Sequence, residues 1–478
     1  MKNTLQFAPN FSRSIRMLGL ALAALSLAVC AQAQTLTYLG QFNGANGGDP
    51  YGPVVQAPDG NFYGQARGPG SAYGEIFRAT PTGQITTLYS FCSQPNCADG
   101  NSSTPPILGS DGNLYGVALH GSGGGYTYSG TLYRMTLGGE ITTLYTFCPS
   151  ANCTYEEIPD GIIQASDGNF YGTTYVGGAN ESGTIFEVSS AGVFTLLHTF
   201  CSLANCADGY GPLLPPIQGS DGNFYGTVQS YAGGVVYKLT PSGAYTVIHT
   251  FCLPCAGGGN PVFSKLSQDA EGNLFGTTIY AADYYNSGTV FEITPTNKYT
   301  GLYSFVFGGG VAPGTGLTLA NDGNLYGVAV NDDFDTGGGY GIAYEVTPAG
   351  EFTSLASFYN DPNGPLVQGT DGNFYATTQY NTAYLDSGDG TVFKLSAGLS
   401  PLVKTNPTMG KVGRSVIILG NNLTGTTSVT FNGVAAAFTV ESDTYIKATV
   451  PTGATTGLVS VVTPTGTLNS NPQFVVTK

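Results

Sequence analysis

Apolar residues along most of this chain fall in short runs of about five to eight, bounded by Gly, Asn, Asp, Ser or Pro. In one well-marked unit these runs occupy residues 161–165, 170–175, 183–188 and 193–200. Asp-Gly-Asn separates the first two runs, and Ser-Ala-Gly precedes the last. Gly and Asn accept the positive φ that tight hairpin turns need. The pattern therefore predicts four antiparallel strands per unit.

The unit recurs seven times, and one hexapeptide marks each copy. Successive copies are 52, 56, 54, 50, 51 and 49 residues apart. A fixed period of about 50 residues is typical of propellers and solenoids. Four antiparallel strands in each unit favour an all-β, seven-bladed β-propeller. The copies are DGNFYG at Asp59, DGNLYG at Asp111, DGNFYG at Asp167 and Asp221, EGNLFG at Glu271, DGNLYG at Asp322 and DGNFYA at Asp371.

The last unit lacks a fourth strand of its own. A matching segment, TLTYLGQF at residues 35–42, precedes the first hexapeptide instead. We expect this N-terminal strand to complete the last blade, because that pairing removes an open sheet edge. The expected propeller spans residues 34–397.

After residue 397 the repeat gives way to short alternating strands separated by Gly, Pro and Asn turns. Apolar segments occur at 416–419, 429–431, 437–440, 446–450 and 459–462. This spacing predicts a small β-sandwich over residues 398–478.

These motifs carry two resemblances. The ordered series DGN[FL]YG, G-T-[VI]-[FY], T-P-x-G and T-L-x-x-F over residues 50–396 resembles the GloVer tandem repeats of secreted bacterial surface proteins. That resemblance implies export and a propeller-like array, and it implies no established activity. Residues 399–478, opening with Asn406-Pro407-Thr408-Met409-Gly410, resemble an IPT/TIG immunoglobulin-like domain. Such a domain implies a spacer or adhesion module.

Residues 1–33 have the features of a secretory signal peptide. Lys2, Arg13 and Arg16 precede an apolar stretch at 17–29, and Ala31-Gln32-Ala33 offers a cleavage site. A lipoprotein anchored through Cys30 is the alternative, although Val29 stands where a lipobox has a small residue. No other apolar run approaches the length of a membrane span. We therefore expect a secreted, extracellular or cell-surface protein.

Charge narrows the range of partners. Beyond residue 33 the chain has 12 basic and 30 acidic residues, a net charge of −18. Nucleic acids and anionic membranes require basic patches, so neither is expected as a partner.

Eight cysteines beyond residue 33 fall into four local pairs, each beginning directly after a Phe that ends a strand. In an exported protein such pairs predict disulfides within short loops. A zinc site is the alternative, and the separation of the pairs by about one repeat disfavours it. The expected pairs are Cys92 with Cys97, Cys148 with Cys153, Cys201 with Cys206 and Cys252 with Cys255.

The long, variable connections follow the second and fourth strands and therefore share one face of the ring, which is the expected site. Tyrosines gather in these loops, and exposed tyrosines suit stacking on sugar rings or contact with a protein. Packing of loop on loop is the alternative. The residues are Tyr126, Tyr128, Tyr175, Tyr231, Tyr280, Tyr284, Tyr285, Tyr340, Tyr380 and Tyr384.

Carboxylates also cluster in two neighbouring variable loops, where oxygen ligands suit Ca²⁺. A solvated acidic loop is the alternative, and the spacing of an EF-hand is absent. The residues are Asp332, Asp333, Asp335, Asp386 and Asp389. Glu156, Glu157 and Asp160 beside Cys153 raise the same question. No cofactor other than this calcium is expected.

The acids of the hexapeptides sit in hairpin turns, where Asp caps neighbouring amides, so we interpret them as structural. The sequence contains no GxSxG or HExxH motif. The leading hypothesis is therefore a scaffold that binds an extracellular glycan or protein and is not an enzyme. The alternatives are a polysaccharide hydrolase or lyase using paired loop carboxylates, and a structural component of the envelope.

Overall fold

The computed structural model describes residues 34–68, 73–119, 130–147, 159–252, 259–261, 264–280, 288–305, 311–313, 315–331, 341–358, 362–379 and 390–477. The regular secondary structure of these residues is almost entirely β-strand, and the helices among them are two short 3₁₀ turns, η1 (Pro95–Cys97) and η2 (Ala204–Cys206). None of the helices in this described part is long and apolar enough to cross a membrane.

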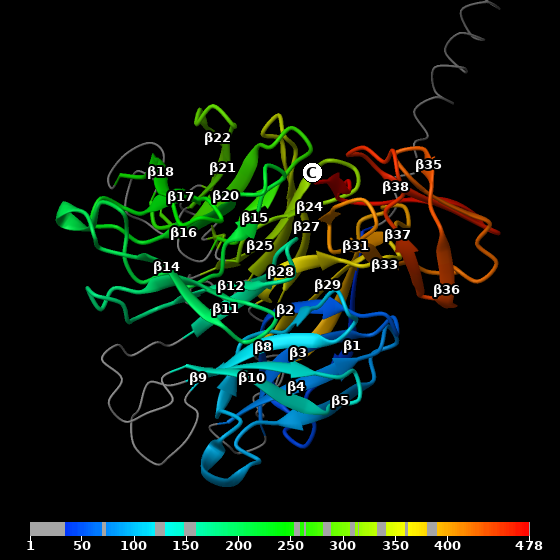
Figure 1. Ribbon diagram of the computed structural model, residues 1–478, viewed down its shortest axis with the longest axis horizontal. Coiled ribbons are helices and arrows are strands. Elements are labelled where there is room, and N and C mark those ends of the chain that lie inside the picture. Colours follow the sequence, from blue (N-terminus) through cyan, green and yellow to red (C-terminus); the bar gives the residue numbers. More distant parts are fainter. Residues whose placement is uncertain are drawn as a thin grey trace, which may run out of the picture.

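Seven antiparallel sheets, termed the repeat sheets, follow one another in chain order between residues 35 and 396 of the described chain (Figure 1). The first three contain β2 (Gly48–Gln56), β3 (Phe62–Arg67), β4 (Gly74–Ala79) and β5 (Ile85–Ser90); β6 (Ser102–Ser103), β7 (Ile107–Leu108), β8 (Leu114–Leu119), β9 (Gly130–Met135) and β10 (Ile141–Phe147); β11 (Pro159–Gln164), β12 (Phe170–Thr174), β13 (Thr184–Val188) and β14 (Phe194–Thr199). The fourth and fifth contain β15 (Ile217–Gln218), β16 (Phe224–Val228), β17 (Val235–Leu239) and β18 (Tyr245–Thr250); β19 (Ser267–Gln268), β20 (Leu274–Thr278), β21 (Thr289–Ile293) and β22 (Tyr299–Ser304). The last two contain β23 (Val311–Ala312), β24 (Thr318–Leu319), β25 (Leu325–Asn331), β26 (Gly341–Val346) and β27 (Phe352–Phe358); β28 (Pro362–Gln368), β29 (Phe374–Thr378), β30 (Thr391–Ser396) and β1 (Thr35–Gln41).

The N-terminal strand completes the seventh sheet, as the strand inventory of the sequence predicts. β1 pairs antiparallel with β30, from Thr35 opposite Ser396 to Gln41 opposite Thr391. The first and last repeat units are thereby joined through backbone hydrogen bonds, and the outer edge of β30 is covered.

Aromatic residues of the hexapeptide explain how one sheet packs on the next. Adjacent positions in a strand point to opposite faces, so its Phe and Tyr contact different neighbours. The Tyr ring of one unit stacks on the Phe ring of the following unit, and the seventh unit stacks on the first in the same way. The ring centroids are 4.7 Å apart for Tyr115 and Phe170, 4.2 Å for Tyr171 and Phe224, 4.4 Å for Tyr326 and Phe374, and 4.0 Å for Tyr375 and Phe62.

The final Gly of the hexapeptide makes room for a third-strand ring. A Cβ built on Gly64 would lie 2.6 Å from the ring of Phe77, closer than carbon atoms pack. The seventh unit has Ala376 at this place, buried in one cluster with Phe393. The glycine is therefore a packing requirement in the first unit, and the seventh unit accommodates a methyl group there.

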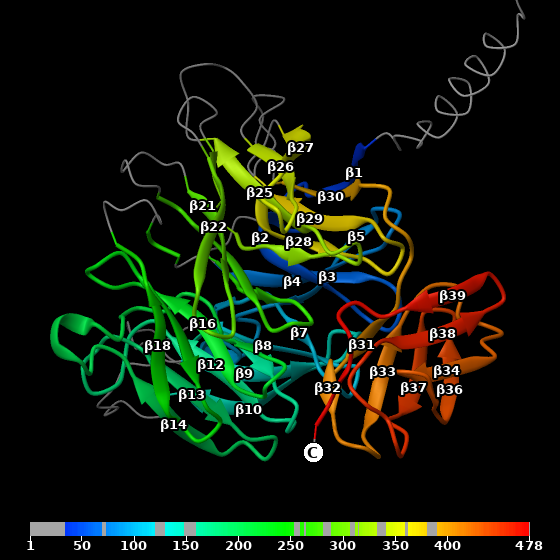
Figure 2. The same ribbon diagram turned by 90° about the horizontal axis from the view of Figure 1, so that it is seen from above.

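Two further sheets pack face to face at the C-terminal end and are termed the C-terminal sandwich (Figure 2). Their shared core includes Val416, Ile418, Phe431, Val461 and Phe474, all buried. This arrangement agrees with the predicted β-sandwich. One sheet contains β31 (Lys404–Asn406), β33 (Ser415–Leu419), β37 (Tyr445–Thr449) and β36 (Phe438–Ser442), and the other contains β35 (Val434–Ala435), β34 (Ser428–Phe431), β38 (Val459–Thr463) and β39 (Gly466–Asn469); β32 (Met409–Gly410) pairs in parallel with β40 (Val475–Val476).

The C-terminal sandwich rests on the side of the repeat sheets that carries the hexapeptide turns, termed the turn face. Ile417 and Leu419 of β33 are buried in one cluster with Ala57, Tyr63 and Leu108 of the first two repeat units. The opposite side, which carries the variable connections, is termed the loop face. The contacts that the sandwich makes with the described repeat residues in this cluster therefore lie on the turn face.

Candidate functional site

The hexapeptide acids are fully engaged inside their own turns. Asp59 accepts hydrogen bonds from the backbone N–H of Asn61 at 3.1 Å, from its Nδ2 at 2.7 Å and from the Tyr63 hydroxyl at 2.7 Å. The same three bonds recur at Asp111, Asp167, Asp221, Asp322 and Asp371. These carboxylates hold the hairpin in shape, which agrees with their structural interpretation.

In the fifth repeat unit a different carboxylate takes over the role of the turn Asp. Glu271 replaces the turn Asp, and the carboxylate of Asp269 instead accepts from the backbone N–H and Nδ2 of Asn273, at 2.7 and 2.8 Å. Phe275 stands where the other units have the bonded Tyr. A Tyr hydroxyl at this position would have no turn Asp to donate to, so a Phe, which has no hydroxyl, fits there.

Two of the predicted disulfides, Cys92–Cys97 and Cys201–Cys206, are present. Cys252 is also disulfide-bonded. Its expected partner Cys255 and the pair Cys148 and Cys153 lie outside the described residues. The two described disulfides therefore close loops on the loop face.

A buried acid organises each described cysteine loop, and it was not anticipated. Asp208 accepts from the backbone N–H groups of Ser202 and Leu203 at 2.9 and 3.1 Å, and from the Ser202 hydroxyl at 2.6 Å. Burial favours the neutral form, but these bonds lower the pKa of Asp208 below its usual value. Asp99 has the same role beside Cys97. The signal in the sequence is the recurring Cys-Ala-Asp-Gly.

Three tyrosines meet on the loop face and are termed the tyrosine cluster: Tyr175, Tyr210 and Tyr231. Tyr175 and Tyr231 are exposed over 43% and 76% of their surface. The ring of Tyr231 lies 5.1 Å from that of Tyr210. A Cβ on Gly211 would approach the Tyr175 ring to 3.0 Å, so this ring lies directly beside the loop. The cluster therefore bridges the third and fourth repeat units.

The backbone of the segment 208–211 fixes the cluster in place. The N–H of Tyr210 donates to the carbonyl of Gln229 at 2.8 Å, and the N–H of Gly211 donates to Ser182 at 2.8 Å. The segment is therefore tied to both neighbouring units. Gly211 has φ of 53°, a conformation that favours glycine.

The structure thus brings together two of the predicted site residues, Tyr175 and Tyr231, and adds Tyr210. Tyr210 follows the cysteine loop directly, in a connection after a fourth strand, whereas the prediction considered only loops after second strands. Tyr280 is half-buried and pairs through its backbone with Gly259. The other seven tyrosines, Tyr126, Tyr128, Tyr284, Tyr285, Tyr340, Tyr380 and Tyr384, lie outside the described residues.

Asp160, at the loop-face end of β11, lies beside the tyrosine cluster. Its Oδ2 is buried without a hydrogen-bond partner. Burial raises the pKa of this carboxyl to about 8, and a bond from the backbone N–H of Tyr175 offsets the effect only in part. Near neutral pH, Asp160 is therefore a largely protonated acid able to donate a hydrogen bond.

The predicted calcium ligands Asp332, Asp333, Asp335, Asp386 and Asp389 lie outside the described residues. Within the part of the chain that the structure describes, no group of three or more His, Cys, Asp or Glu side chains could hold a metal ion. Calcium binding by those loops stays a prediction.

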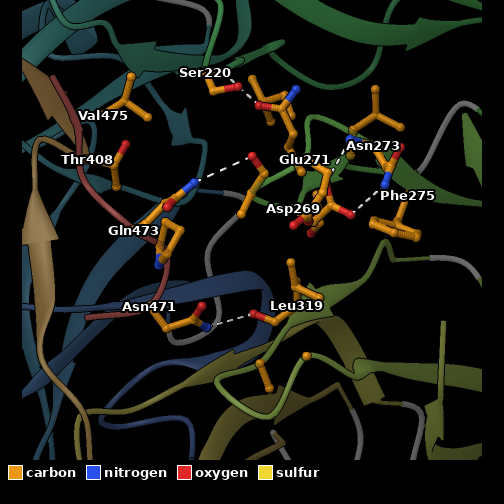
Figure 3. Close-up of a pocket in the computed structure, with 18 of the residues that line it drawn as sticks. Ser220, Asp269, Glu271, Asn273, Phe275, Leu319, Thr408, Asn471, Gln473 and Val475 are labelled. Atoms are coloured by element: carbon orange, nitrogen blue, oxygen red, sulfur yellow. Dashed lines mark hydrogen bonds between the residues drawn. The ribbon is translucent and has the colours of Figure 1, made fainter. Parts of the chain in front are cut away.

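Two cavities lie on the turn face, away from the expected site. They have volumes of about 900 and 550 Å³, are partly open to solvent, and are lined by residues of both the repeat sheets and the C-terminal sandwich. Figure 3 shows the larger cavity, where side chains of both parts face one another. Polar residues such as Asp269 and Asn273 line its repeat side, and Thr408 and Gln473 line its sandwich side.

Several solved structures are similar to this chain at low sequence identity. A gluconolactonase from Xanthomonas campestris is 13% identical, with a TM-score of 0.37, and the match covers 72% of this chain and 98% of that one. TolB from Acinetobacter baumannii is 14% identical, with a TM-score of 0.37, and the match covers 73% and 71%. A prolyl endopeptidase is 11% identical, with a TM-score of 0.44, and the match covers 88% and 62%.

No curated protein matches the sequence significantly. The family model of the Gloeobacter/Verrucomicrobia repeat matches twice, over residues 27–231 and 212–439. Together the two matches span well over half of the chain, including all seven hexapeptides. The chain therefore belongs to the Gloeobacter/Verrucomicrobia repeat family.

Proposed function

We propose that this protein is a secreted or cell-surface scaffold that binds an extracellular glycan or protein through its loop face. In this proposal residues 1–33 direct export, the seven repeat sheets are the blades of a propeller, and the C-terminal sandwich is an IPT/TIG-like module. The observation that carries the proposal is the tyrosine cluster, which exposes large aromatic surface on a backbone fixed by hydrogen bonds and a disulfide.

Physical chemistry explains why such a cluster suits recognition. A tyrosine contributes a large apolar area and a hydroxyl while losing little conformational freedom on binding. Because the segment carrying Tyr210 is tied to both neighbouring units, less ordering entropy is lost when a ligand docks. Stacking faces next to polar groups suit a sugar, and the same surface also suits a protein partner.

Binding on a glycan array, with and without Ca²⁺, tests the proposal on residues 34–478. We expect Tyr231→Ala and Tyr175→Ala each to weaken a specific hit at least tenfold. Tyr38→Ala is the matched control, because Tyr38 is 45% exposed but lies on β1 in the seventh sheet. Equal loss in the control would contradict the assignment of the site. If no glycan binds, capture of a surface protein that Tyr231→Ala abolishes would identify a protein ligand.

A polysaccharide hydrolase or lyase is the second candidate, and the raised pKa of Asp160 favours it. A general acid must be protonated at the working pH, and Asp160 meets that condition. Glycoside hydrolysis also requires a second carboxylate about 5 to 10 Å away. None of the described carboxylates contributes to the raised pKa of Asp160, which burial alone raises. Release of reducing ends that Asp160→Asn abolishes would establish this activity.

A further inference from the structure

The C-terminal sandwich closes the turn face through side-chain amides that reach backbone carbonyls of the repeats. Nδ2 of Asn406 donates to the carbonyls of Leu108 and Gly109 at 2.9 and 3.0 Å. Nδ2 of Asn471 donates to the carbonyl of Leu319 at 3.0 Å (Figure 3). These contacts involve the second and sixth repeat units, so the sandwich spans the middle of the turn face.

The smaller cavity lies beneath this closure and has mainly apolar walls. Val54, Leu108, Leu266 and Leu366 come from four different repeat units, and Leu419 comes from the sandwich. A volume of about 550 Å³ falls within the range of small-molecule sites. The walls provide a surface for the apolar part of a ligand.

Two lysines line this cavity, Lys265 from the fifth repeat unit and Lys404 from β31. No hydrogen bond or ion pair joins either ammonium group to any of the described residues, although other basic residues such as Lys238 are paired. The field of Asp371 reaches Lys404 from a distance. Lys265 retains solvent-accessible surface while protein surrounds it, which places its side chain in the wet interior of the cavity.

The two ammonium groups lining this cavity would both be stabilised by a bound anion. Burial lowers the pKa of Lys404 to about 8, with Asp371 opposing the shift, and burial also lowers the pKa of Lys265. A negative charge near both ammonium groups would favour their charged forms and offset the effect of burial.

We propose that this cavity binds a small organic anion, a carboxylate or phosphate with an apolar body, whose charged group is held by Lys265 and Lys404. The chain as a whole is strongly acidic, so two lysines lining one cavity are locally unusual in it. The apolar walls would receive the body of the ligand. Because both parts of the molecule supply a lysine, the ligand would also bridge the repeat sheets and the C-terminal sandwich.

The larger cavity gives this site a connection to the rest of the turn face. Lys265, Leu266 and Gln268 line both cavities, so the two spaces are contiguous at these residues. Asp269 and Glu271 line only the larger one. Negative charge there disfavours anions, so we assign the anionic group to the smaller cavity.

Binding is tested on residues 34–478 by calorimetric titration and thermal shift at pH 7 and low salt. The probes are octanoate and octyl phosphate, with octanamide as the neutral control of equal length. We expect at least one anion, and not the amide, to bind and to raise the Tm. Lys265→Gln and Lys404→Gln should each weaken binding at least tenfold, whereas Lys411→Gln, at an exposed position of the sandwich, should leave it unchanged.

A second measurement keeps the proposal testable if these probes do not fit. Native mass spectrometry of the protein as purified should detect a bound anionic molecule that is absent from the double variant Lys265→Gln/Lys404→Gln. Without ligand, the variants should be at least as stable as the natural chain, because an uncompensated charge is removed. Equal binding of the amide, binding unchanged in the variants, or the absence of any bound or binding anion would each overturn the proposal.

Discussion

Among the described residues, three sets of aspartates differ in how their carboxylates are bonded, and only the structure separates them. In the hexapeptide turns the aspartate bonds a neighbouring amide and a Tyr hydroxyl at the surface. In the cysteine loops Asp99 and Asp208 are buried but fully bonded. Asp160 has a buried oxygen without a partner. For Asp208 the hydrogen bonds outweigh burial and lower the pKa, whereas for Asp160 burial outweighs its one backbone hydrogen bond and raises the pKa.

Replacing Asp208 should destabilise the cysteine loop that leads into the fourth repeat unit. Asp208→Ala leaves two backbone N–H groups and a Ser hydroxyl without their acceptor, which costs about 2–4 kcal/mol. We expect the Tm to fall by several degrees and the loop near Cys206 to become cleavable by protease. Glu351→Ala, at an exposed position, is the control and should change the Tm very little. An equal effect of the two variants would contradict the role of Asp208.

Asp160 should make the stability depend on pH in the opposite sense from most carboxylates. Its pKa is about 8 in the folded state and 3.8 as the reference for the unfolded state. Between these values only the folded state retains the proton, so its contribution to stability falls as the pH rises from about 4 to 8. Asp160→Asn removes this penalty.

As the pH rises from 5 to 8, we expect the free energy of unfolding of Asp160→Asn to increase by about 1–3 kcal/mol relative to that of the natural chain. This is less than the full pKa shift implies, because Asp160 is only partly buried. Thermal unfolding of both proteins at the two pH values measures the difference. Asp59→Asn, in an exposed turn, serves as the comparison. A gap between Asp160→Asn and the natural chain that is independent of pH would show that the carboxyl is ionised throughout.

Among the secondary-structure elements, the short strand β1 matters most for closing the repeat region, because it joins the last repeat unit to the start of the chain. It covers the edge of β30 and connects the two ends of the repeat region. An uncovered strand edge offers unpaired N–H and C=O groups to other chains. The seventh sheet therefore depends on a segment that lies more than 350 residues away in the sequence.

Removing β1 should loosen the ring and promote association. A chain beginning at Asn43 is expected to have a Tm at least 5 °C lower than one beginning at Gln34, and to form oligomers in light scattering. The loss follows from a whole strand of hydrogen bonds, each contributing about 1 kcal/mol. If the shorter chain remains monomeric with an unchanged Tm, β1 is dispensable and closure rests on the stacking of Phe62 on Tyr375.

At the scale of the whole molecule, the two faces are differently employed. The turn face is covered by the C-terminal sandwich, and the loop face presents the tyrosine cluster to solvent. Asn406 and Asn471 reach carbonyls of separate repeat units, so the sandwich acts as a brace across the ring. Mutual stabilisation of the two parts follows from this arrangement.

The double variant Asn406→Ala/Asn471→Ala should weaken the docking. Each change leaves carbonyl groups without a donor at a cost of about 1–2 kcal/mol. We expect one calorimetric transition of the natural chain to separate into two, with faster proteolysis between residues 396 and 404. Ser460→Ala removes a hydrogen bond to Asn469 inside the sandwich and is the control. Splitting of the transition by the control alone would contradict a bracing role for the two amides.

Much of the fold was predictable because it is written locally and repeated. The turn chemistry of Asp-Gly-Asn, the alternation of Phe and Tyr, and the 50-residue period are all properties of short segments. The strand inventory also predicted that β1 belongs to the last unit. Two cysteine pairs followed from their separation of five residues, since so short a loop leaves few other partners.

The site was predictable only in part. The sequence by itself determined the all-β repeat, the local disulfides and the tyrosine-rich character of the loops, because neighbours in the chain decide these. Tertiary structure alone decided that Tyr210 joins Tyr175 and Tyr231, that Asp160 lies beside them with one buried oxygen lacking a hydrogen bond, and that Lys265 and Lys404 share a cavity. These groups come from segments that are far apart in sequence, and their burial and partners depend on how whole sheets pack.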